Sequence, residues 1–386
     1  MKSQISHAVD AIKEELLGIN LYLYSNPELG YKEYLACEKL TSYLKNRGFC
    51  IEKNISGLPT AFRAIYDSGK PGASIAFICE YDALPEVGHG CGHNMVSAMS
   101  IGAATGLIDV VNEYGGKIFV FGTPAEETDG GKTIMVESGV FDEIDFCFLL
   151  HPGKQSEESG EMLAMDSWRF DFHGKSAHAS TSPEEGINAL DCVIHLFNGI
   201  NSFRQFIKDD VRIHGIICDG GKAPNVIPDF ASAKFYVRAD SRAYLNEINK
   251  HIFSIAEGAA KMTGAAVKIS SYENSYDNLK SNSVMSKIWR NNMHELGFDE
   301  IFPPTKTMGS SDVGNVSQRV PTIHPYIDMG DSSLVWHTKE MADSTITEIG
   351  HSRIISGAKS LAFTGFELLS DNKLAQEVRN EFSRVR

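Results

Sequence analysis

The stretch "ASIAFICEYDALPEVGHGCGHNMVSA", residues 73–98, decides how this chain folds. It begins with a short run of apolar and β-branched residues that stops in polar ones, which is the pattern of a buried strand. It ends in the start of a helix of small and apolar residues, which we expect over 94–113. A glycine-rich loop that contains Cys91 and His93 joins the two. A buried strand followed by a helix is the repeating unit of an α/β fold.

The same pattern recurs further along the chain. "GKIFVFGTPAEE", residues 116–127, and "FDEIDFCFLLHPG", residues 141–153, are β-rich runs that also stop in polar residues. Strands that alternate with helices predict a largely parallel sheet with helices on both faces. Because the carboxyl ends of parallel strands meet at one edge of the sheet, we expect a ligand site there.

The pattern changes near residue 167, where "SWRFDFHG" alternates apolar and polar residues as a half-exposed strand does. A helix is expected from residue 183, two strands within 209–218 and 231–240, a helix that ends before Gly264, and a strand over 265–272. This βαββαβ order is the ferredoxin-like one. We therefore predict an α/β domain over 1–166 and 278–386, interrupted by a smaller ferredoxin-like α+β domain over 167–277.

Composition excludes several kinds of partner. The chain has 386 residues and a formal net charge of −14, whereas nucleic acids and anionic membranes select basic surfaces. The first residues lack the apolar run of a signal peptide, and no uncharged apolar run reaches the roughly 18 residues of a membrane span. The seven cysteines are odd in number and scattered, as is usual for reduced thiols. We expect a cytoplasmic protein.

Groups that bind metals stand where strands are expected to end. Each has an ordinary alternative, because a lone histidine is often a hydrogen-bonded surface residue and adjacent glutamates often lie in solvent. Taken together, a thiolate, three imidazoles and two carboxylates suit zinc or a similar divalent ion. They exceed what one tetrahedral ion uses, so two ions that share a ligand or a water fit better, with one glutamate left as a general base. These groups are Cys91, His93, Glu126, Glu127, His151 and His337.

An ordered set of motifs resembles one known family. The motifs cover nearly the whole chain: "NPELGYKEYLA", "EYDALPEVGHGCGHN", "GTPAEETDGGK", "HGKSAHASTSPEEGINALD", "NVIPD", "GSSDVGNVS" and "WHTKE". The chain resembles the dinuclear-metal aminoacylase and carboxypeptidase family of zinc peptidases. Within it, the chain is similar to the amidohydrolase branch of hippurate and auxin-conjugate hydrolases, and most of all to the subgroup of aminobenzoyl-glutamate utilisation protein B.

The resemblance assigns roles in the metal site. It implies two divalent ions in each subunit, zinc first and manganese, cobalt or nickel as alternatives, with Glu126 as general base. The carboxypeptidase branch has a His-x-Asp pair where this chain has Glu80 and Asp82, so these two either orient ligands or are structural. His89 lies outside the matched pair and is interpreted as a spectator. The implied metal ligands are Cys91, His93, Glu127, His151 and His337.

The resemblance also implies substrate contacts from the smaller domain. His178 is similar to the lid histidine that supports the oxyanion of the scissile carbonyl, and Asn225 holds a substrate-side position. Arg238 either pairs with a substrate carboxylate or is solvated. Gly309 and Ser310 offer backbone donors to the substrate terminus.

A homodimer through the smaller domain is implied as well. In such a dimer, His178 of one chain reaches the metal site of the other. The pairing surface is expected at an exposed edge of that domain, such as the strand over 167–173 or the helix over 183–203.

These features predict a metal-dependent amidohydrolase. The expected substrate is a small N-acyl or aroyl amino acid, of the aminobenzoyl-glutamate or acyl-amino-acid type, with a free carboxylate. A metallo-exopeptidase or dipeptidase with the same site is the first alternative, and a non-catalytic metal-containing binding protein is the second. Glu126 argues against the binding protein, because a structural metal site needs no free base. A serine hydrolase is disfavoured because the chain has no Gly-x-Ser-x-Gly motif.

Overall fold

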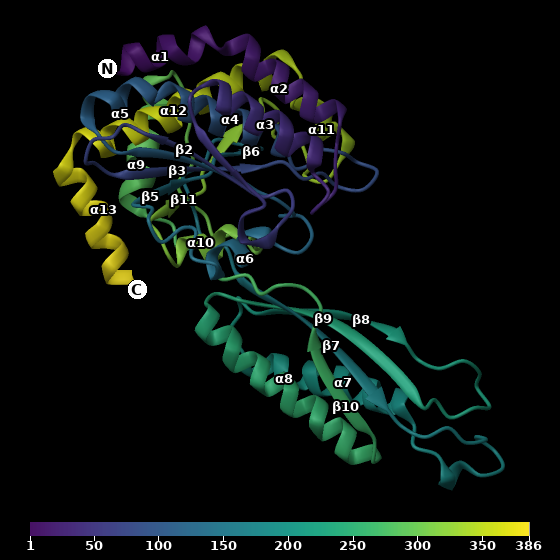
Figure 1. Cartoon of the computed structure of the whole chain (residues 1–386). Helices are drawn as coiled ribbons and strands as arrows, with labels where there is room; N and C mark the ends of the chain where they lie inside the picture. The colour runs from purple at the N-terminus through teal and green to yellow at the C-terminus, as the bar shows by residue number, and fades with distance from the viewer. Residues whose placement is uncertain (386) are drawn as a thin grey trace. The chain divides into compact units, whose positions relative to one another are not determined.

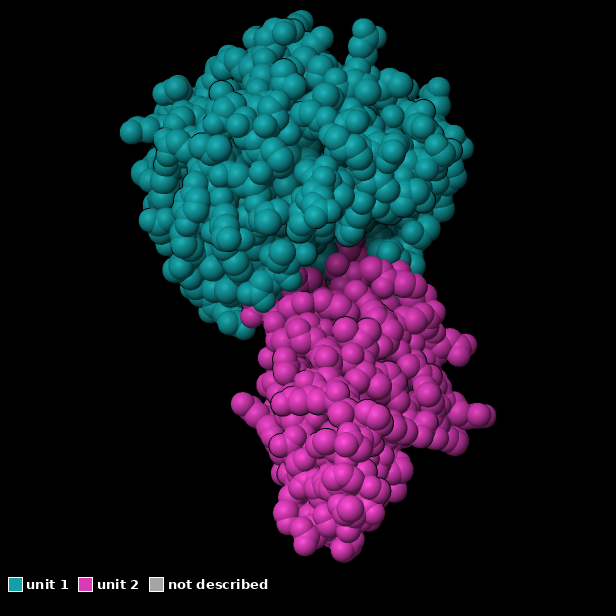
Figure 2. Space-filling model, turned by 90° about the vertical axis from the view of Figure 1, so that its right-hand side faces the viewer, with its two compact units in different colours: residues 1–161, 279–307, 311–386 teal, residues 162–278, 308–310 magenta. Residues whose placement is uncertain are grey.

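The computed structural model describes residues 1–385, which form two compact units (Figures 1 and 2). The first unit comprises residues 1–161, 279–307 and the chain from 311 onward. The second comprises residues 162–278 together with 308–310. The second unit therefore interrupts the first, and the range 167–277 lies inside it.

A mostly parallel sheet forms the centre of the first unit. Its strands lie in the order β1, β2, β4, β3, β5, β11. The last four pair in parallel, while β1 and β2 form an antiparallel margin. A separate parallel pair, β6 (His151–Gly153) and β12 (Tyr326–Asp328), follows β5 and β11 along the chain. The sheet strands are β1 (Cys50–Lys53), β2 (Phe62–Asp67), β3 (Ser74–Glu80), β4 (Lys117–Thr123), β5 (Phe146–Phe148) and β11 (Thr322–Ile323).

Helices surround this sheet (Figure 1). The most buried is α4, all of whose residues are shielded from solvent as it packs against β3, α2 and α12. The stretch His93–Tyr114 is long and apolar enough to cross a membrane, but 89% of its apolar window is buried inside the protein, as in a core helix. The helices are α1 (Lys2–Ala11), α2 (Lys13–Ser25), α3 (Tyr34–Asn46), α4 (His93–Gly106), α5 (Ile108–Tyr114), α6 (Gly131–Glu137), α9 (Ser283–Glu295), α10 (Val313–Ser317), α11 (Lys339–Ser344), α12 (Glu348–Ser370) and α13 (Asn372–Val385).

The second unit has the predicted ferredoxin-like order. Its sheet runs β10, β7, β9, β8, with every neighbouring pair antiparallel. Two helices cover one face and bury an apolar core that includes Phe170, Phe172 and Phe235. The α/β fold with a ferredoxin-like insertion is thereby confirmed. The elements are β7 (Ala164–His173), α7 (Ala189–Phe203), β8 (Arg212–Asp219), β9 (Phe230–Ala239), α8 (Arg242–Thr263) and β10 (Ala266–Ser271).

Two local predictions for this unit are wrong. The helix expected from residue 183 begins at Ala189, because 183–185 is a single 3₁₀ turn and Asn188 caps the helix by accepting the N–H of Leu190 at 3.0 Å. The strand over 167–173 is not an exposed edge, because β7 pairs with β10 on one side and with β9 on the other. The edge strands are β8 and β10.

Candidate metal centre

The residues predicted to bind metal come together in the first unit. His93 is the first residue of α4, Cys91 precedes it, and His151 begins β6. The ligand atoms of Cys91, His93 and His151 all lie within 4.8 Å of one another, as do those of Cys91, Glu127 and His337. Cys91 belongs to both groups. The arrangement is that expected of two ions with one shared thiolate ligand.

Two glycines allow the loop at Cys91 to approach its neighbours. Gly92 has φ +82°, and a Cβ there would lie 2.4 Å from Pro152 Cγ, next to His151. A Cβ at Gly90 would lie 2.6 Å from Val87 Cγ1 and 3.3 Å from the Cα of His337. The absence of both side chains lets these three chain segments meet.

Residues beside the site adopt strained backbone conformations. Ala125, next to Glu126, has φ +62°, and His337 has φ +66°. Each left-handed non-glycine residue costs roughly 1–3 kcal/mol, so the surrounding structure must hold it. At His337 the backbone N–H donates to the Gly90 carbonyl at 2.9 Å. The strain is therefore stored where the candidate ligands are placed.

Hydrogen bonds orient two of the imidazoles. His93 Nδ1 lies 2.9 Å from Asp82 Oδ1, and His151 Nδ1 lies 2.8 Å from the Pro152 carbonyl. Because each Nδ1 donates to oxygen, each Nε2 lone pair is directed to the cluster. His151 Nε2 is 3.6 Å from Cys91 Sγ. Asp82 also accepts the Glu127 N–H at 2.8 Å, so it acts on two candidate ligands.

Buried atoms in the cluster lack hydrogen-bond partners within the part of the chain that is described. They are His93 Nε2 and Glu127 Oε1. Burial, followed by Glu127, raises the pKa of the Cys91 thiol well above its ordinary value. Burial also raises the pKa of Glu126, and the neighbouring carboxylates of Glu127 and Glu80 add to it. A thiolate and carboxylates this close require positive charge, and sulfur, nitrogen and oxygen donors together fit zinc or another first-row divalent ion.

A buried lysine beside the cluster was not predicted from the sequence. The Nζ atom of Lys132 lies 2.7 Å from Glu80 Oε1 and 2.7 Å from Asp312 Oδ1, and all three side chains are inaccessible to solvent. Burial raises the pKa of Glu80, but Lys132 and nearby histidines outweigh it and hold that pKa at about 2. Glu80, Glu126 and Asp312 also lie within 4.8 Å of one another. Lys132 already supplies the positive charge beside Glu80 and Asp312, so this group is an ion-pair network.

Glu33 is a second residue that sequence reasoning missed. Its carboxylate is buried and accepts the Ala125 N–H at 2.9 Å and the Thr60 hydroxyl at 2.7 Å. It thus holds the left-handed residue that precedes Glu126. Burial raises the pKa of Glu33 to about 7. The only sequence signal was its place in the "NPELGYKEYLA" motif.

Two buried histidines also lie at this end of the unit. His324, which was not predicted, stacks on His151 with ring centroids 5.5 Å apart. His89, interpreted as a spectator, is buried, and burial lowers its pKa to about 4. His89 belongs to none of the candidate ligand groups formed by the described residues.

The predicted substrate contacts lie in the second unit, and two of them are neighbours. The backbone N–H of Ala179 donates to the Asn225 carbonyl at 3.0 Å, so Asn225 adjoins His178, and both are exposed. The Nδ1 atom of His178 accepts the N–H groups of Ser180 and Thr181, each at 3.3 Å. Because Nδ1 accepts, the proton of the neutral ring is on Nε2, which can donate to an oxyanion.

Arg238 and Ser310 form a second pair in this unit. The Arg238 Nε donates to Ser310 Oγ at 3.3 Å, and its Nη1 atom lies 2.7 Å from His214 Nε2. The Gly309 carbonyl accepts the Leu163 N–H at 3.0 Å, so this oxygen is used within the unit.

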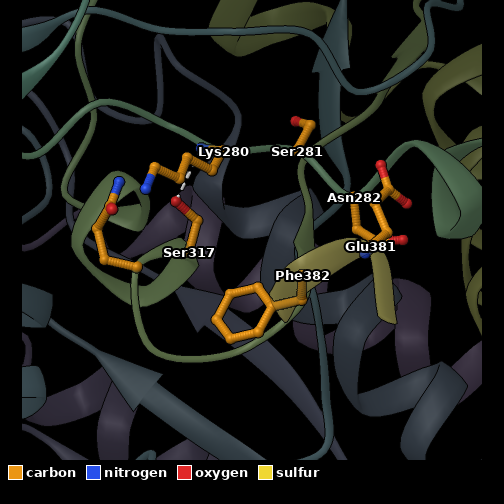
Figure 3. A pocket seen from close by; sticks show the side chains of 7 residues that line it. Lys280, Ser281, Asn282, Ser317, Glu381 and Phe382 are labelled. Atoms are coloured by element: carbon orange, nitrogen blue, oxygen red, sulfur yellow. Dashed lines mark hydrogen bonds between the residues drawn. The ribbon is translucent and has the colours of Figure 1, made fainter. Parts of the chain in front are cut away.

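A small cavity elsewhere in the first unit does not contribute to the site (Figure 3). It lies where α9 meets α13, and the Glu381 carboxylate there accepts the N–H groups of Ser283 and Val284. Its volume is about 20 Å³, which suits one water molecule. The cavity therefore belongs to helix capping and packing.

Comparison with known proteins gives a consistent result. The sequence model of "Peptidase family M20/M25/M40" matches residues 76–352. The chain is 33% identical over 398 residues to the "Xaa-Arg dipeptidase" of Mus musculus, covering 99% of this chain and 92% of that one. It is 28% identical over 463 residues to one of the chains of the p-aminobenzoyl-glutamate hydrolase of Escherichia coli K12, covering 99% and 94%. A solved dinuclear metal-binding M20 peptidase of Bacillus subtilis shares the fold with a TM-score of 0.70 at 19% identity, covering 93% of this chain and 99% of that one.

Proposed function

Because this chain belongs to peptidase family M20/M25/M40, whose members hydrolyse amide bonds, we propose that it cleaves one amide bond in a small N-acyl or aroyl amino acid with a free carboxylate. The resemblance to the dinuclear-metal peptidases is confirmed, and the chain is a metal-dependent amidohydrolase or peptidase. The substrate class is the part that is proposed.

The observation that carries the proposal is the pair of ligand groups that share Cys91. His93 and His151 would complete one group, and Glu127 and His337 the other. Divalent ions bound there would acidify water and polarise the scissile carbonyl. Glu126, whose carboxylate lies within 4.8 Å of ligand atoms of His93 and Glu127, would take the proton from that water and pass it to the leaving nitrogen.

We further propose that residues of the second unit bind the substrate. The Nε2–H of His178 is available to stabilise the oxyanion, and the neighbouring Asn225 would contact the same group. Arg238 would bind the substrate carboxylate, with Ser310 and Gly309 beside it. Support comes from Arg238 itself, whose guanidinium bonds to Ser310 and His214 and has no carboxylate within ion-pair distance among residues 1–385.

The proposal includes a homodimer in which His178 of one copy serves the metal site of the other. The exposed edge strand β8, with Ile216 64% and Ile217 48% accessible, and the neighbouring helix α7 are suitable pairing elements. We propose zinc as the first choice of metal, with manganese, cobalt or nickel as alternatives. The seven cysteines, all within the described part of the chain, are free, which supports a cytoplasmic location.

A dipeptidase is the second candidate. It is favoured by the 33% identity to a protein named Xaa-Arg dipeptidase and would use the same catalytic groups. A binding protein is disfavoured by the carboxylate of Glu126, which a structural metal site would not need.

A substrate panel with metal analysis tests these alternatives. The panel contains p-aminobenzoyl-glutamate, hippurate, N-acetyl amino acids, and dipeptides that include Xaa-Arg. Hydrolysis of acyl or aroyl amino acids above dipeptides supports the proposal, and the reverse order supports the dipeptidase. Glu126→Gln should keep its metal and lose roughly 10²-fold or more in kcat. No turnover by a metal-loaded wild type on any compound would refute both enzymes in favour of a binding protein.

A further inference from the structure

Arg238 lies on the face of the second unit's sheet that the helices leave open. Residues of β8 and β9 pair in register as Arg212 with Arg238 and His214 with Tyr236. The alternate pair, Ile213 with Val237, is buried in the core. Because successive strand residues point to opposite faces, Arg238 and His214 share the open face.

The guanidinium of Arg238 is fixed on three sides. Its Nε donates to Ser310 Oγ, its Nη1 donates to His214 Nε2 at 2.7 Å, and its carbon lies 5.4 Å from the centre of the Tyr236 ring. In the described part of the chain no carboxylate lies within ion-pair distance of it, and the Glu273 carboxylate acts on it from farther away. Its Nη2 has no hydrogen bond there either. This nitrogen can therefore donate to an anion while Nε and Nη1 hold the guanidinium in place.

The bond to His214 fixes the protonation of that histidine. Arginine can only donate, so His214 Nε2 must accept, and the ring must be neutral with its proton on Nδ1. The groups around His214 are mostly cationic: besides Arg238, Arg204 donates to the Ile213 carbonyl at 2.6 Å, and Arg212 lies two residues before His214 on the same face of β8. On the same face the Glu273 carboxylate accepts the hydroxyl of Tyr236, the cross-strand partner of His214, at 2.7 Å, and Tyr272 adjoins the Tyr236 ring.

We propose that His214 is a positioning residue that holds Arg238 in the orientation that binds the substrate carboxylate. The inference rests on the role proposed above for Arg238 and adds that the binding of the carboxylate by Arg238 depends on the protonation of His214. A neutral His214 accepts from the guanidinium, whereas a protonated His214 cannot accept and repels it. Affinity for the carboxylate should therefore fall when the ring takes up a proton.

The direction of the pH effect follows from the surroundings. Burial, and then Arg238 and Arg204, lower the pKa of His214 from its ordinary value of 6.5. His214 is therefore neutral at neutral pH, and the affinity for the substrate carboxylate falls only at acid pH. Losing one positioned hydrogen bond changes affinity by roughly 2- to 10-fold.

The test measures KM and kcat between pH 5 and 8 for an acyl amino acid and for its carboxamide. In wild type, KM for the carboxylate should rise roughly 2- to 10-fold toward acid pH relative to the carboxamide, with the kcat profiles parallel. His214→Gln, whose amide oxygen accepts without titrating, should keep KM low and remove the rise. His214→Leu should show the high KM at every pH. A His214→Gln profile identical to wild type would overturn the proposal.

His173→Gln is the matched control, because His173 is also exposed on this sheet and its ring packs on that of Phe230, with no arginine hydrogen-bonded to it among residues 1–385. This variant should keep the wild-type profile. A second readout does not need turnover. NMR of ¹³Cε1-labelled histidine should show the His214 pKa rising in Arg238→Met. If no substrate is hydrolysed, the proposed function has failed, yet the NMR shift still decides whether the pair exists. An unchanged pKa in Arg238→Met would refute the pair.

Discussion

Replacing Lys132 with methionine is the sharpest test of how the metal centre is supported. Lys132 lies between Glu80 and Asp312, with its Nζ atom 2.7 Å from an oxygen of each and no solvent access to any of the three. Methionine fills a similar volume but carries no charge. Lys132→Met should therefore leave two buried carboxylates without their cation, next to Glu126.

The size of the effect follows from burial. Removing one partner of a buried ion pair costs about 3–5 kcal/mol, because the remaining charge is left uncompensated. For a unit of this size, that corresponds to a fall in Tm of roughly 6–20 °C. A matched surface variant is Lys117→Met, whose partner Asp67 lies 3.0 Å away with both side chains more than 40% exposed. Such an exposed pair contributes about 0–1 kcal/mol.

Calorimetric unfolding of both variants and wild type provides the measurement, at neutral pH and at pH 5. The Lys132→Met deficit should shrink at the lower pH, where the orphaned carboxylates take up protons more readily. The double variant with Asp312→Asn should recover part of the loss, since it removes one of the two charges. A fall in stability no larger than that of Lys117→Met would refute the assignment of Lys132 as the cation that holds this site together.

Three further predictions address the pH dependence, the metal and the assembly. Because burial raises the pKa of Glu33 from 4.5 to about 7, the folded state retains a proton that the unfolded chain releases, and stability should fall as pH rises through that range. Glu33→Gln should remove this slope and be more stable than wild type above pH 7 by at most roughly 3 kcal/mol; parallel unfolding curves from pH 4 to 8 would contradict this. Cys91→Ser should reduce metal affinity by more than the roughly 10- to 100-fold that is typical when a residue that only orients a ligand is mutated. Its circular dichroism spectrum should stay native. Full metal content by mass spectrometry would show that Cys91 is not a ligand. Mixed subunits of Glu126→Gln and His178→Ala, each nearly inactive alone, should regain about a quarter of the wild-type sites, whereas no recovery after proven subunit exchange would place His178 in its own chain's site.

Much of the fold was predictable because local patterns determine it. The apolar runs over 73–84 and 116–127 became β3 and β4, and the alternating pattern after residue 167 became β7. The neighbours of β7 were not predictable in this way. Its partner β10 is about a hundred residues away, and no local pattern states that β7 lies inside the sheet. The expected edge at 167–173 was wrong for this reason.

The candidate site likewise contains residues that a local pattern predicts and residues that only the fold brings together. The ligand loop around Cys91 and His93 is a local motif, so its spacing can be recognised. Lys132 and Asp312 are 180 residues apart, and Glu33 lies 92 residues before the backbone N–H that it accepts. In the sequence each is an ordinary charged residue. Only the folded chain buries them beside the site, and burial is what gives them a role.

The pairing of β7 with β10 has a consequence for how the first unit folds. Beyond the last β7–β10 pair, near the two ends of the insertion, Met165 and Tyr276 form a further antiparallel bridge with backbone hydrogen bonds of 2.8 and 2.9 Å. The insertion therefore closes on itself beside the points where it leaves and rejoins the first unit. Loop-closure entropy grows with the length of a flexible chain, but once this ladder forms, the first unit has only a short connection to close. The two parts of the first unit that flank the insertion can then pack together at the entropy cost of closing a short loop, although about a hundred residues separate them in the sequence.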